Sequence, residues 1–279
     1  MNKYLKYINR IEFVVTMACT GKCKHCSQGS HISNEHIDGE IAEKAVYDIC
    51  KHYKINSLMT FGGEPLLYPE TVCKIHSAAK EIKIPNRELI TNGYFSKDIN
   101  RIKNVAHMLA ESGVISVLLS VDAFHQETIP LEYVKTFAKA VLDERISIYT
   151  HPAWLVSMDD DNKYNLQTRK ILKEFDALGI GQSSGNVIFP SGNALKYLGK
   201  YFKENVEYNN PYIENPKDIK TVTFSANGDV LNGNIYENSI LDIMNSYTVW
   251  IKGRIILPFK FYIIVFSVIL MYNQNVYWF

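Results

Sequence analysis

The chain has 279 residues and a formal net charge of +1, and its 30 basic residues are scattered rather than arranged in a stripe. This balance excludes a partner bound mainly through phosphate charge, so we expect no nucleic acid. With 47% hydrophobic and 21% charged residues, the composition is that of a folded protein with a sizeable core. The N-terminal stretch MNKYLKYINRIEF has no apolar signal-peptide core. We therefore expect a cytoplasmic protein whose thiols stay reduced.

From residue 11 to about residue 190, short β-branched runs alternate with segments whose apolar residues recur every three or four positions. The expected strands are IEFVVT (11–16), SLMTFGG (57–63), RELITNG (87–93), VISVLLSVD (114–122), ISIYTH (146–151) and NVIFP (186–190). Among the helices between them, one is expected to have Ser96 as its N-cap and Gly113 as its stop. Such alternation predicts an α/β fold with a parallel sheet. Six units predict a partial (β/α)6 TIM-like barrel, open on one side, with a small C-terminal extension.

The sequence divides into a core domain, a C-terminal extension and an apolar tail, expected over residues 1–190, 191–249 and 250–279. Within the extension, Asn227-Gly228 predicts the turn of a hairpin. The longest apolar run of the tail, residues 261–272, is shorter than the roughly 20 residues that span a bilayer. A buried or partner-covered element, a membrane anchor and an aberrant terminus without purpose remain open, although we do not expect the protein to bind a membrane.

Three of the five cysteines fall within eight positions on the loop after the first expected strand: Cys19, Cys23 and Cys26. One loop can bring three thiolates to one metal or iron–sulfur site, yet a structural zinc site or a cubane usually takes four ligands. Cys50 and Cys73 lie in expected helices beside apolar faces, where core packing is the expected role. His25 or His31 could complete a zinc site; otherwise, one iron of a cubane is left open.

The next three expected strands also end in distinctive residues: GGEP (62–65), TNG (91–93) and SVD (120–122). In parallel α/β folds, sites are built at the carboxyl ends of the strands. We therefore expect these residues to border the same site as the cysteine loop. Taken alone, GGEP is also consistent with a simple strand-to-helix turn.

Cys19-x3-Cys23-x2-Cys26, joined to Gly62-Gly63-Glu64-Pro65 at the end of the next strand, resembles the radical S-adenosylmethionine (SAM) superfamily over roughly residues 10 to 190. The resemblance implies that the three cysteines hold a [4Fe-4S] cluster and that SAM chelates its fourth iron. Such enzymes cleave SAM reductively to a 5′-deoxyadenosyl radical, which abstracts hydrogen from a substrate. The resemblance also implies a small-molecule or peptide substrate and an electron donor such as flavodoxin or ferredoxin.

The resemblance further implies SAM contacts for residues at the strand ends. Gly62 and Gly63 would let the backbone approach SAM closely, and Glu64 would be the electrostatic partner of its ammonium group. Asn92 would support the methionyl carboxylate, although a turn role for Asn-Gly is also open. Ser120 and Asp122 lie two positions apart, so a strand would place them on one face, to bind the ribose hydroxyls or the carboxylate.

No catalytic residue is identified, because the radical would be generated at the cluster. His125 and Glu127 follow the fourth strand and are candidates to face the substrate, although surface positions on the same loop are equally consistent.

Two departures from the family pattern concern the C-terminal part. Asn193 replaces the arginine of a P-x-G-R-A segment, and no cysteine follows Cys73. The extension therefore resembles a SPASM/twitch-type region that lacks its cluster ligands. A non-catalytic iron–sulfur or zinc-binding structural or interaction protein is the competing hypothesis, and a degenerate enzyme that binds SAM poorly is a third.

Overall fold

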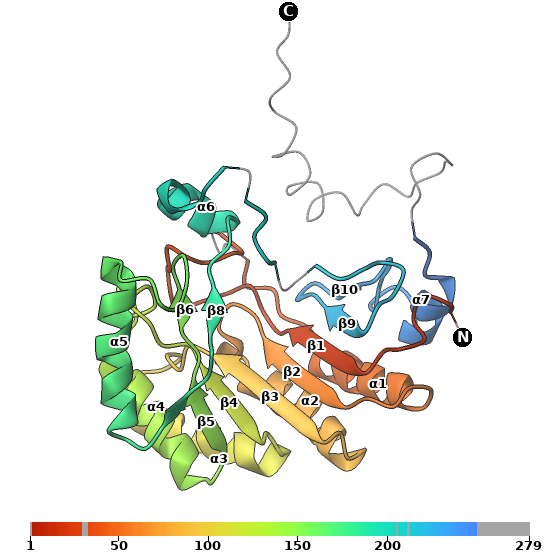
Figure 1. Ribbon diagram of the computed structural model, residues 1–279. Helices are drawn as coiled ribbons and strands as arrows, with labels where there is room; N and C mark the ends of the chain where they lie inside the picture. Colours follow the sequence, from red (N-terminus) through yellow and green to blue (C-terminus); the bar gives the residue numbers. More distant parts are fainter. Residues whose placement is uncertain (1, 30–32, 205, 211–212, 250–279) are drawn as a thin grey trace, which may run out of the picture.

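The computed structural model describes residues 2–29, 33–204, 206–210 and 213–249 (Figure 1). Residues 250–279, the apolar tail of the sequence, and His31 lie outside the described residues. Among the described residues, no helix is both long enough and apolar enough to cross a bilayer.

One sheet of nine strands organises the described residues, in the order β11-β10-β9-β1-β2-β3-β4-β5-β7. Its parallel part consists of β9 (Thr221–Phe224), β1 (Arg10–Val14), β2 (Ser57–Phe61), β3 (Asn86–Thr91), β4 (Ser116–Leu119), β5 (Ser147–Thr150) and β7 (Gly181–Gln182). The two edge strands, β7 and β11 (Gly233–Asn234), do not pair with each other, so the sheet is not closed. The α/β fold and the open, partial barrel expected from the sequence are therefore confirmed.

Helices cover the outer face of this sheet, which Figure 1 shows with α1 to α4 behind the strands. They are α1 (Gly39–Cys50), α2 (Pro69–Glu81), α3 (Ile99–Ser112), α4 (Leu131–Asp143) and α5 (Lys163–Asp176). Their apolar stripes pack on the strands and form the main core. Gly113 ends α3 in a left-handed conformation, as expected, with φ 87°. The N-cap of α3 is Asp98 rather than Ser96, whose hydroxyl instead accepts a hydrogen bond from the Asp98 backbone.

The sixth strand differs from the expectation. The main sheet continues with Gly181–Gln182, and the expected strand NVIFP instead supplies β8 (Asn186–Val187). This strand pairs in parallel with β6 (Ala153–Trp154) in a separate two-stranded sheet. The segments that follow β5 and β7 leave the main sheet at His151–Pro152 and at Ser183–Gly185. They then run side by side as β6 and β8.

The C-terminal extension joins the other edge of the sheet. Its strand β9 pairs in parallel with β1, and the ring of Phe224 stacks on Phe13 at 4.6 Å. The expected hairpin follows: β9 and β10 (Asp229–Val230) are antiparallel, with Gly228 at φ 86° in the turn. Helix α7 (Ile240–Ser246) then packs on α1. Helix α6 (Gly192–Leu198) and a 3-10 turn, Gly199–Tyr201, precede β9 in the sequence, and a second 3-10 turn, Pro65–Leu67, lies between β2 and α2.

Candidate functional site

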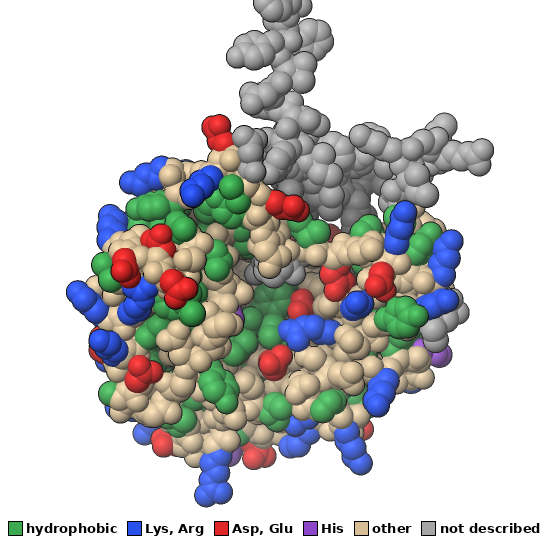
Figure 2. Space-filling model, viewed as in Figure 1, with side chains coloured by type: hydrophobic (Ala, Val, Ile, Leu, Met, Phe, Trp, Pro, Cys, Tyr) green, Lys and Arg blue, Asp and Glu red, His purple; other side chains and the backbone are tan. Residues whose placement is uncertain are grey.

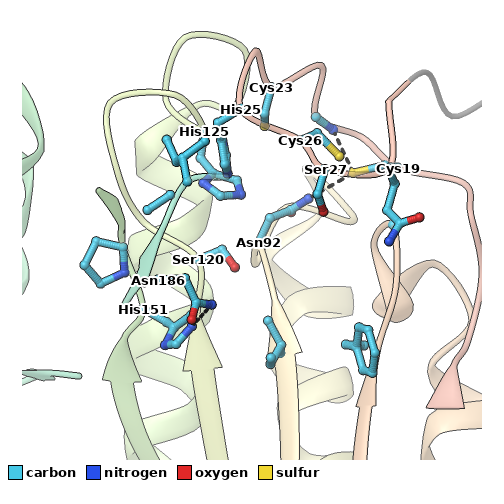
Figure 3. A pocket seen from close by; sticks show the side chains of 18 of the residues that line it. Cys19, Cys23, His25, Cys26, Ser27, Asn92, Ser120, His125, His151 and Asn186 are labelled. Atoms are coloured by element: carbon cyan, nitrogen blue, oxygen red, sulfur yellow. Dashed lines mark hydrogen bonds between the residues drawn. The ribbon is translucent and has the colours of Figure 1, made fainter. Parts of the chain in front are cut away.

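A pocket lies at the carboxyl ends of the parallel strands, where the cysteine loop crosses them (Figure 3). All three clustered cysteines line it, and so do residues from the ends of the next strands. Figure 2 shows the corresponding face of the molecule hollowed near its centre, with hydrophobic side chains in the hollow and charged ones of both signs near it. The structure therefore brings the separate sequence motifs to one place.

The cysteine loop leaves β1 and is folded by local turns. The backbone N–H of Cys26 donates to the Cys23 carbonyl, and the N–H of Gly29 donates to the Cys26 carbonyl. Burial raises the pKa of the Cys19 thiol to about 12, with the Glu64 carboxylate as the second cause, and burial likewise raises the pKa of Cys23 and Cys26. A bound metal cation would reverse this effect and favour the thiolates.

Gly62 and Gly63 lie against the backbone of the cysteine loop. A Cβ at Gly62, where φ is 145°, would lie 2.5 Å from the Thr16 carbonyl oxygen, and one at Gly63 would lie 2.1 Å from that of Ala18. The N–H of Gly63 donates to Thr16 and the N–H of Glu64 to Ala18, at 2.7 and 2.8 Å. The glycines are required here because two backbones meet without room for a side chain. Both glycines also line the pocket.

Glu64 is fully buried, and both of its carboxylate oxygens accept hydrogen bonds from the protein. Oε1 accepts from the Leu66 backbone N–H and the Thr91 hydroxyl, and Oε2 accepts from the Asn92 backbone N–H, all within 2.7–2.9 Å. Burial raises the pKa of Glu64 to about 7. The carboxylate therefore ties the end of β2 to the end of β3, behind the residues that line the pocket.

Asn92 performs the expected turn role and also contacts the cysteine loop. Its Oδ1 accepts from the Tyr94 backbone N–H at 2.8 Å, and Gly93 follows at φ 71°. Its Nδ2 lies 3.2 Å from the Thr20 hydroxyl and 3.6 Å from the Cys19 sulfur. The amide therefore connects the end of β3 to the first cysteine, and it lines the pocket.

Ser120 and Asp122 were expected on one face of a strand, but the strand does not extend to them. Strand β4 ends at Leu119, so both residues lie in the turn beyond it. Ser120 lines the pocket, whereas Asp122 is fully buried and all its hydrogen bonds are to the protein. Oδ1 accepts from the backbone N–H groups of Phe124 and His125, and Oδ2 accepts from the Ala153 N–H and lies 2.8 Å from His125 Nδ1. Burial would raise the pKa of Asp122, but the adjacent His125 and these hydrogen bonds hold it well below its usual range.

His125 and Glu127, the two candidates that follow Asp122, have different surroundings. His125 lines the pocket, and its ring centroid lies 4.7 Å from that of His25. Glu127 points instead to the cysteine loop, where it forms an ion pair with Lys24 at 3.0 Å. This ion pair, together with the hydrogen bond from the Lys22 N–H to the Thr128 hydroxyl, braces the loop from the β4–α4 side.

A family model identifies the chain. The model of the radical SAM superfamily matches residues 13–155, just over half of the chain, and this range contains the cysteine motif and the GGEP, TNG and SVD segments. The chain belongs to the radical SAM superfamily.

Curated relatives of this radical SAM chain include a probable GTP 3′,8-cyclase from Saccharolobus islandicus, 26% identical over 132 residues. A protein of the same name from Saccharolobus solfataricus is 25% identical. Each match covers 46% of this chain and 39% of the relative, so the chain matches only about two-fifths of the relatives' length.

Solved radical SAM structures show the same fold. Streptococcus suis SuiB bound to S-adenosylmethionine has a TM-score of 0.57 at 14% identity, covering 87% of this chain and 67% of SuiB. Native anSMEcpe with bound AdoMet has a TM-score of 0.55 at 16% identity, covering 85% and 80%. BtrN in complex with AdoMet and 2-DOIA has a TM-score of 0.52 at 16% identity, covering 86% and 82%.

The start of α6 clamps the cysteine loop of this radical SAM chain, a contact that the sequence did not predict. The N–H of Asn193 donates to the Cys26 carbonyl at 2.9 Å, and its side-chain amide donates to the Cys23 carbonyl at 3.2 Å. The hydroxyl of Ser191 donates to the Ser27 carbonyl at 3.0 Å. The only sequence signal was that Asn193 stands where the family segment has arginine.

The remaining pocket wall comes from the bends after β5 and β7. His151 Nδ1 lies 2.8 Å from the Ser183 hydroxyl, and its Nε2 lies 2.8 Å from the side-chain amide of Asn186 (Figure 3). Val187 lies beside them and is exposed. This wall therefore combines polar side chains, His151 and Asn186, with an apolar one, Val187, in the same pocket as the cysteine loop.

Proposed function

We propose that this chain is a radical SAM enzyme that binds a [4Fe-4S] cluster through Cys19, Cys23 and Cys26 and SAM beside it. The observation that carries the proposal is that three cysteines of one loop line a pocket together with Gly62 and Gly63. The two other cysteines of the chain lie in α1 and α2 and pack against the core, so they are not available as a fourth ligand. When bound, the cluster would supply the electron that cleaves SAM to a 5′-deoxyadenosyl radical for hydrogen abstraction.

The residues that hydrogen-bond to the cysteine loop fit this group because they hold the loop in place. Gly63 and Glu64 bind the loop backbone on one side, and Asn193 binds it on the other. Asn92 donates to the Cys19 sulfur, as hydrogen bonds to cluster sulfurs commonly do to tune a cluster. We infer that these residues hold the three thiolates in place at the pocket.

For SAM, we infer direct contacts from the residues that line the pocket: Gly62, Gly63, Asn92 and Ser120. Glu64 and Asp122 are assigned as positioning residues, because their carboxylate oxygens already accept hydrogen bonds from the chain. His125 is the remaining candidate to face the substrate, whereas the ion pair of Glu127 with Lys24 favours a role in bracing the loop.

The proposed substrate is a peptide or a small molecule bound against the wall formed by His151, Asn186 and Val187. Both classes occur among the structural relatives: SuiB has been solved with its precursor peptide SuiA, and BtrN with 2-DOIA. A flavodoxin or ferredoxin is proposed as the electron donor. A thiolate-held cluster also fits the reducing cytoplasm.

Anaerobic reconstitution with iron and sulfide tests the proposal. The protein should gain the brown colour and broad visible absorbance of an iron–sulfur cluster and, with SAM and dithionite, should release 5′-deoxyadenosine. Cys23→Ala should abolish both signals, and Cys73→Ala, which removes a thiol outside the pocket, should keep both. A protein that stays colourless would support the alternative of a zinc-binding structural protein, and a brown protein that never cleaves SAM would support a non-catalytic one.

A further inference from the structure

A second set of metal-binding atoms lies at one side of the pocket. The Cys23 sulfur and one ring nitrogen each from His25 and His125 lie within 4.8 Å of one another. Figure 3 shows the two imidazole rings together below Cys23. We propose that the iron-free chain binds a single zinc-type divalent ion at Cys23, His25 and His125, with water at the fourth position.

His125 is held in the form that a metal ligand requires. Asp122 accepts backbone N–H bonds from Phe124, His125 and Ala153, so its carboxylate is an acceptor and Nδ1 of His125 donates to it at 2.8 Å. In a neutral ring with this hydrogen bond, the lone pair lies on Nε2. A carboxylate that orients a metal-binding histidine in this way is a general feature of zinc sites, where it fixes the tautomer and raises ligand basicity.

His25 supplies an independent observation. Its Nδ1 is buried and has no hydrogen-bond partner among the described residues. The ring is held in place by Phe124 at 5.1 Å and by His125 at 4.7 Å. A buried polar nitrogen without a partner is costly, and a metal ion bound at Nδ1 of His25 would remove that cost.

The donor set selects the class of ion. One thiolate and two neutral imidazoles suit a borderline ion that accepts tetrahedral geometry, such as Zn²⁺ or Co²⁺, rather than Mg²⁺ or Ca²⁺, which take oxygen ligands. Three protein ligands leave one position for water. The set needs neither Cys19 nor Cys26, so it differs from the proposed cluster site in every ligand except Cys23.

Because Cys23 is common to both sets, single-ion binding and cluster assembly exclude each other. A chain that meets zinc before iron and sulfide would hold a colourless ion and resist cluster assembly until the ion is removed. The metal that arrives first would therefore determine which state the chain adopts.

Titration of the reduced, metal-free full chain with Co²⁺ tests the proposal under anaerobic conditions. The wild type should bind one Co²⁺, with a thiolate-to-cobalt charge-transfer band and the intense visible bands of tetrahedral cobalt, and Zn²⁺ should displace it. His125→Gln and His25→Phe should each weaken Co²⁺ binding by about 10-fold or more. Both variants should still gain iron–sulfur absorbance on reconstitution, because neither removes a cluster thiolate.

Cys19→Ala is the matched control and should do the reverse, binding Co²⁺ as the wild type does while failing to assemble the cluster. The proposal is wrong if the wild type binds no Co²⁺, or if Cys19→Ala and Cys26→Ala abolish binding that both histidine variants retain. In the latter case the ion lies among the three thiolates. His25→Phe keeps an aromatic ring against Phe124, so it decides the question even if His125→Gln does not fold. None of these measurements needs SAM cleavage, so they stand apart from the proposed enzyme activity.

Discussion

The side-chain amide of Asn193 donates a hydrogen bond to the backbone carbonyl of Cys23, although 170 positions separate the two residues. The same amide lies 3.4 Å from the Gly29 carbonyl, so one side chain joins the middle of the cysteine loop to its end. The loop geometry thus depends on a residue at the start of the C-terminal extension.

We predict that Asn193→Ala loosens the cysteine loop. It removes both side-chain hydrogen bonds but keeps the backbone bond to Cys26, so the cost should be about 1 kcal/mol. A reconstituted cluster should then bleach roughly 5-fold faster in the presence of a ferrous chelator, followed by visible absorbance. Lys196→Ala, on an exposed position of the same helix, should bleach at the wild-type rate. Equal rates for Asn193→Ala and wild type would contradict the clamp.

Gly63→Ala should damage both the fold and cluster assembly. The new methyl group would lie 2.1 Å from the Ala18 carbonyl oxygen, which is backbone and cannot rotate away. We expect a loss of about 2 kcal/mol in the free energy of unfolding, measured in urea, and little iron–sulfur absorbance after reconstitution. Gly199→Ala is the control, since no atom outside the adjoining backbone and chain neighbours lies within 4 Å of its added methyl group. A Gly63→Ala protein as stable as the control would show that the loop can move aside.

Glu64 should make the stability of the metal-free chain depend on pH. Burial raises its pKa to about 7 from 4.5, so the folded state retains a proton that the unfolded state has lost. This contribution is fully present below about pH 4.5 and is lost as the pH rises through 7, a change of roughly 3 kcal/mol. The free energy of unfolding of the wild type relative to Glu64→Gln should therefore fall between pH 5 and pH 8. If the difference in free energy of unfolding between the wild type and Glu64→Gln stays constant from pH 5 to pH 8, the pKa of Glu64 is not raised.

Asp122→Asn should be among the most destabilising single-atom changes in the pocket region. The carboxylate is fully buried, accepts three backbone N–H bonds and pairs with His125, so an amide would place a donor against donors. We expect a loss of about 3 kcal/mol by urea denaturation. Asp161→Asn, which affects an exposed ion pair with Arg169, should change stability far less. Similar losses in the two variants would mean that the Asp122 network contributes little.

Much of the architecture was predictable because local signals and tertiary structure agree. The runs that became β1 to β5 are β-branched and bounded by loops, and the residues after β1 to β4 lie at one edge because parallel strands place their carboxyl ends together. The sixth strand was not predictable, because Gly181–Gln182 has no β-branched residue and pairs only through its place after α5. Ser96 and Asp98 are both good N-cap residues, and only the local backbone selects Asp98.

Within the site, the sequence predicted where the motif residues lie in the fold, but not which partners their side chains contact. The SAM contact of Glu64 stays a prediction, and the hydrogen bonds by which it joins two strands could not be predicted from the motif. Strand alternation could not place Ser120 and Asp122, because it holds only inside a strand and β4 ends at Leu119, one residue before Ser120. Asn193 could not be placed, because its partners are distant in sequence.

The parallel pairing of β9 with β1 has a consequence for the order of folding. During synthesis, the first strand emerges early, but its neighbour on one side emerges only with Thr221–Phe224, near the end of the described chain. Contacts between such distant segments form late, because the intervening chain must first be ordered. The strand from which the cysteine loop departs would therefore gain its second neighbour only after residues 221–224 have left the ribosome, and we expect metal insertion to follow that step.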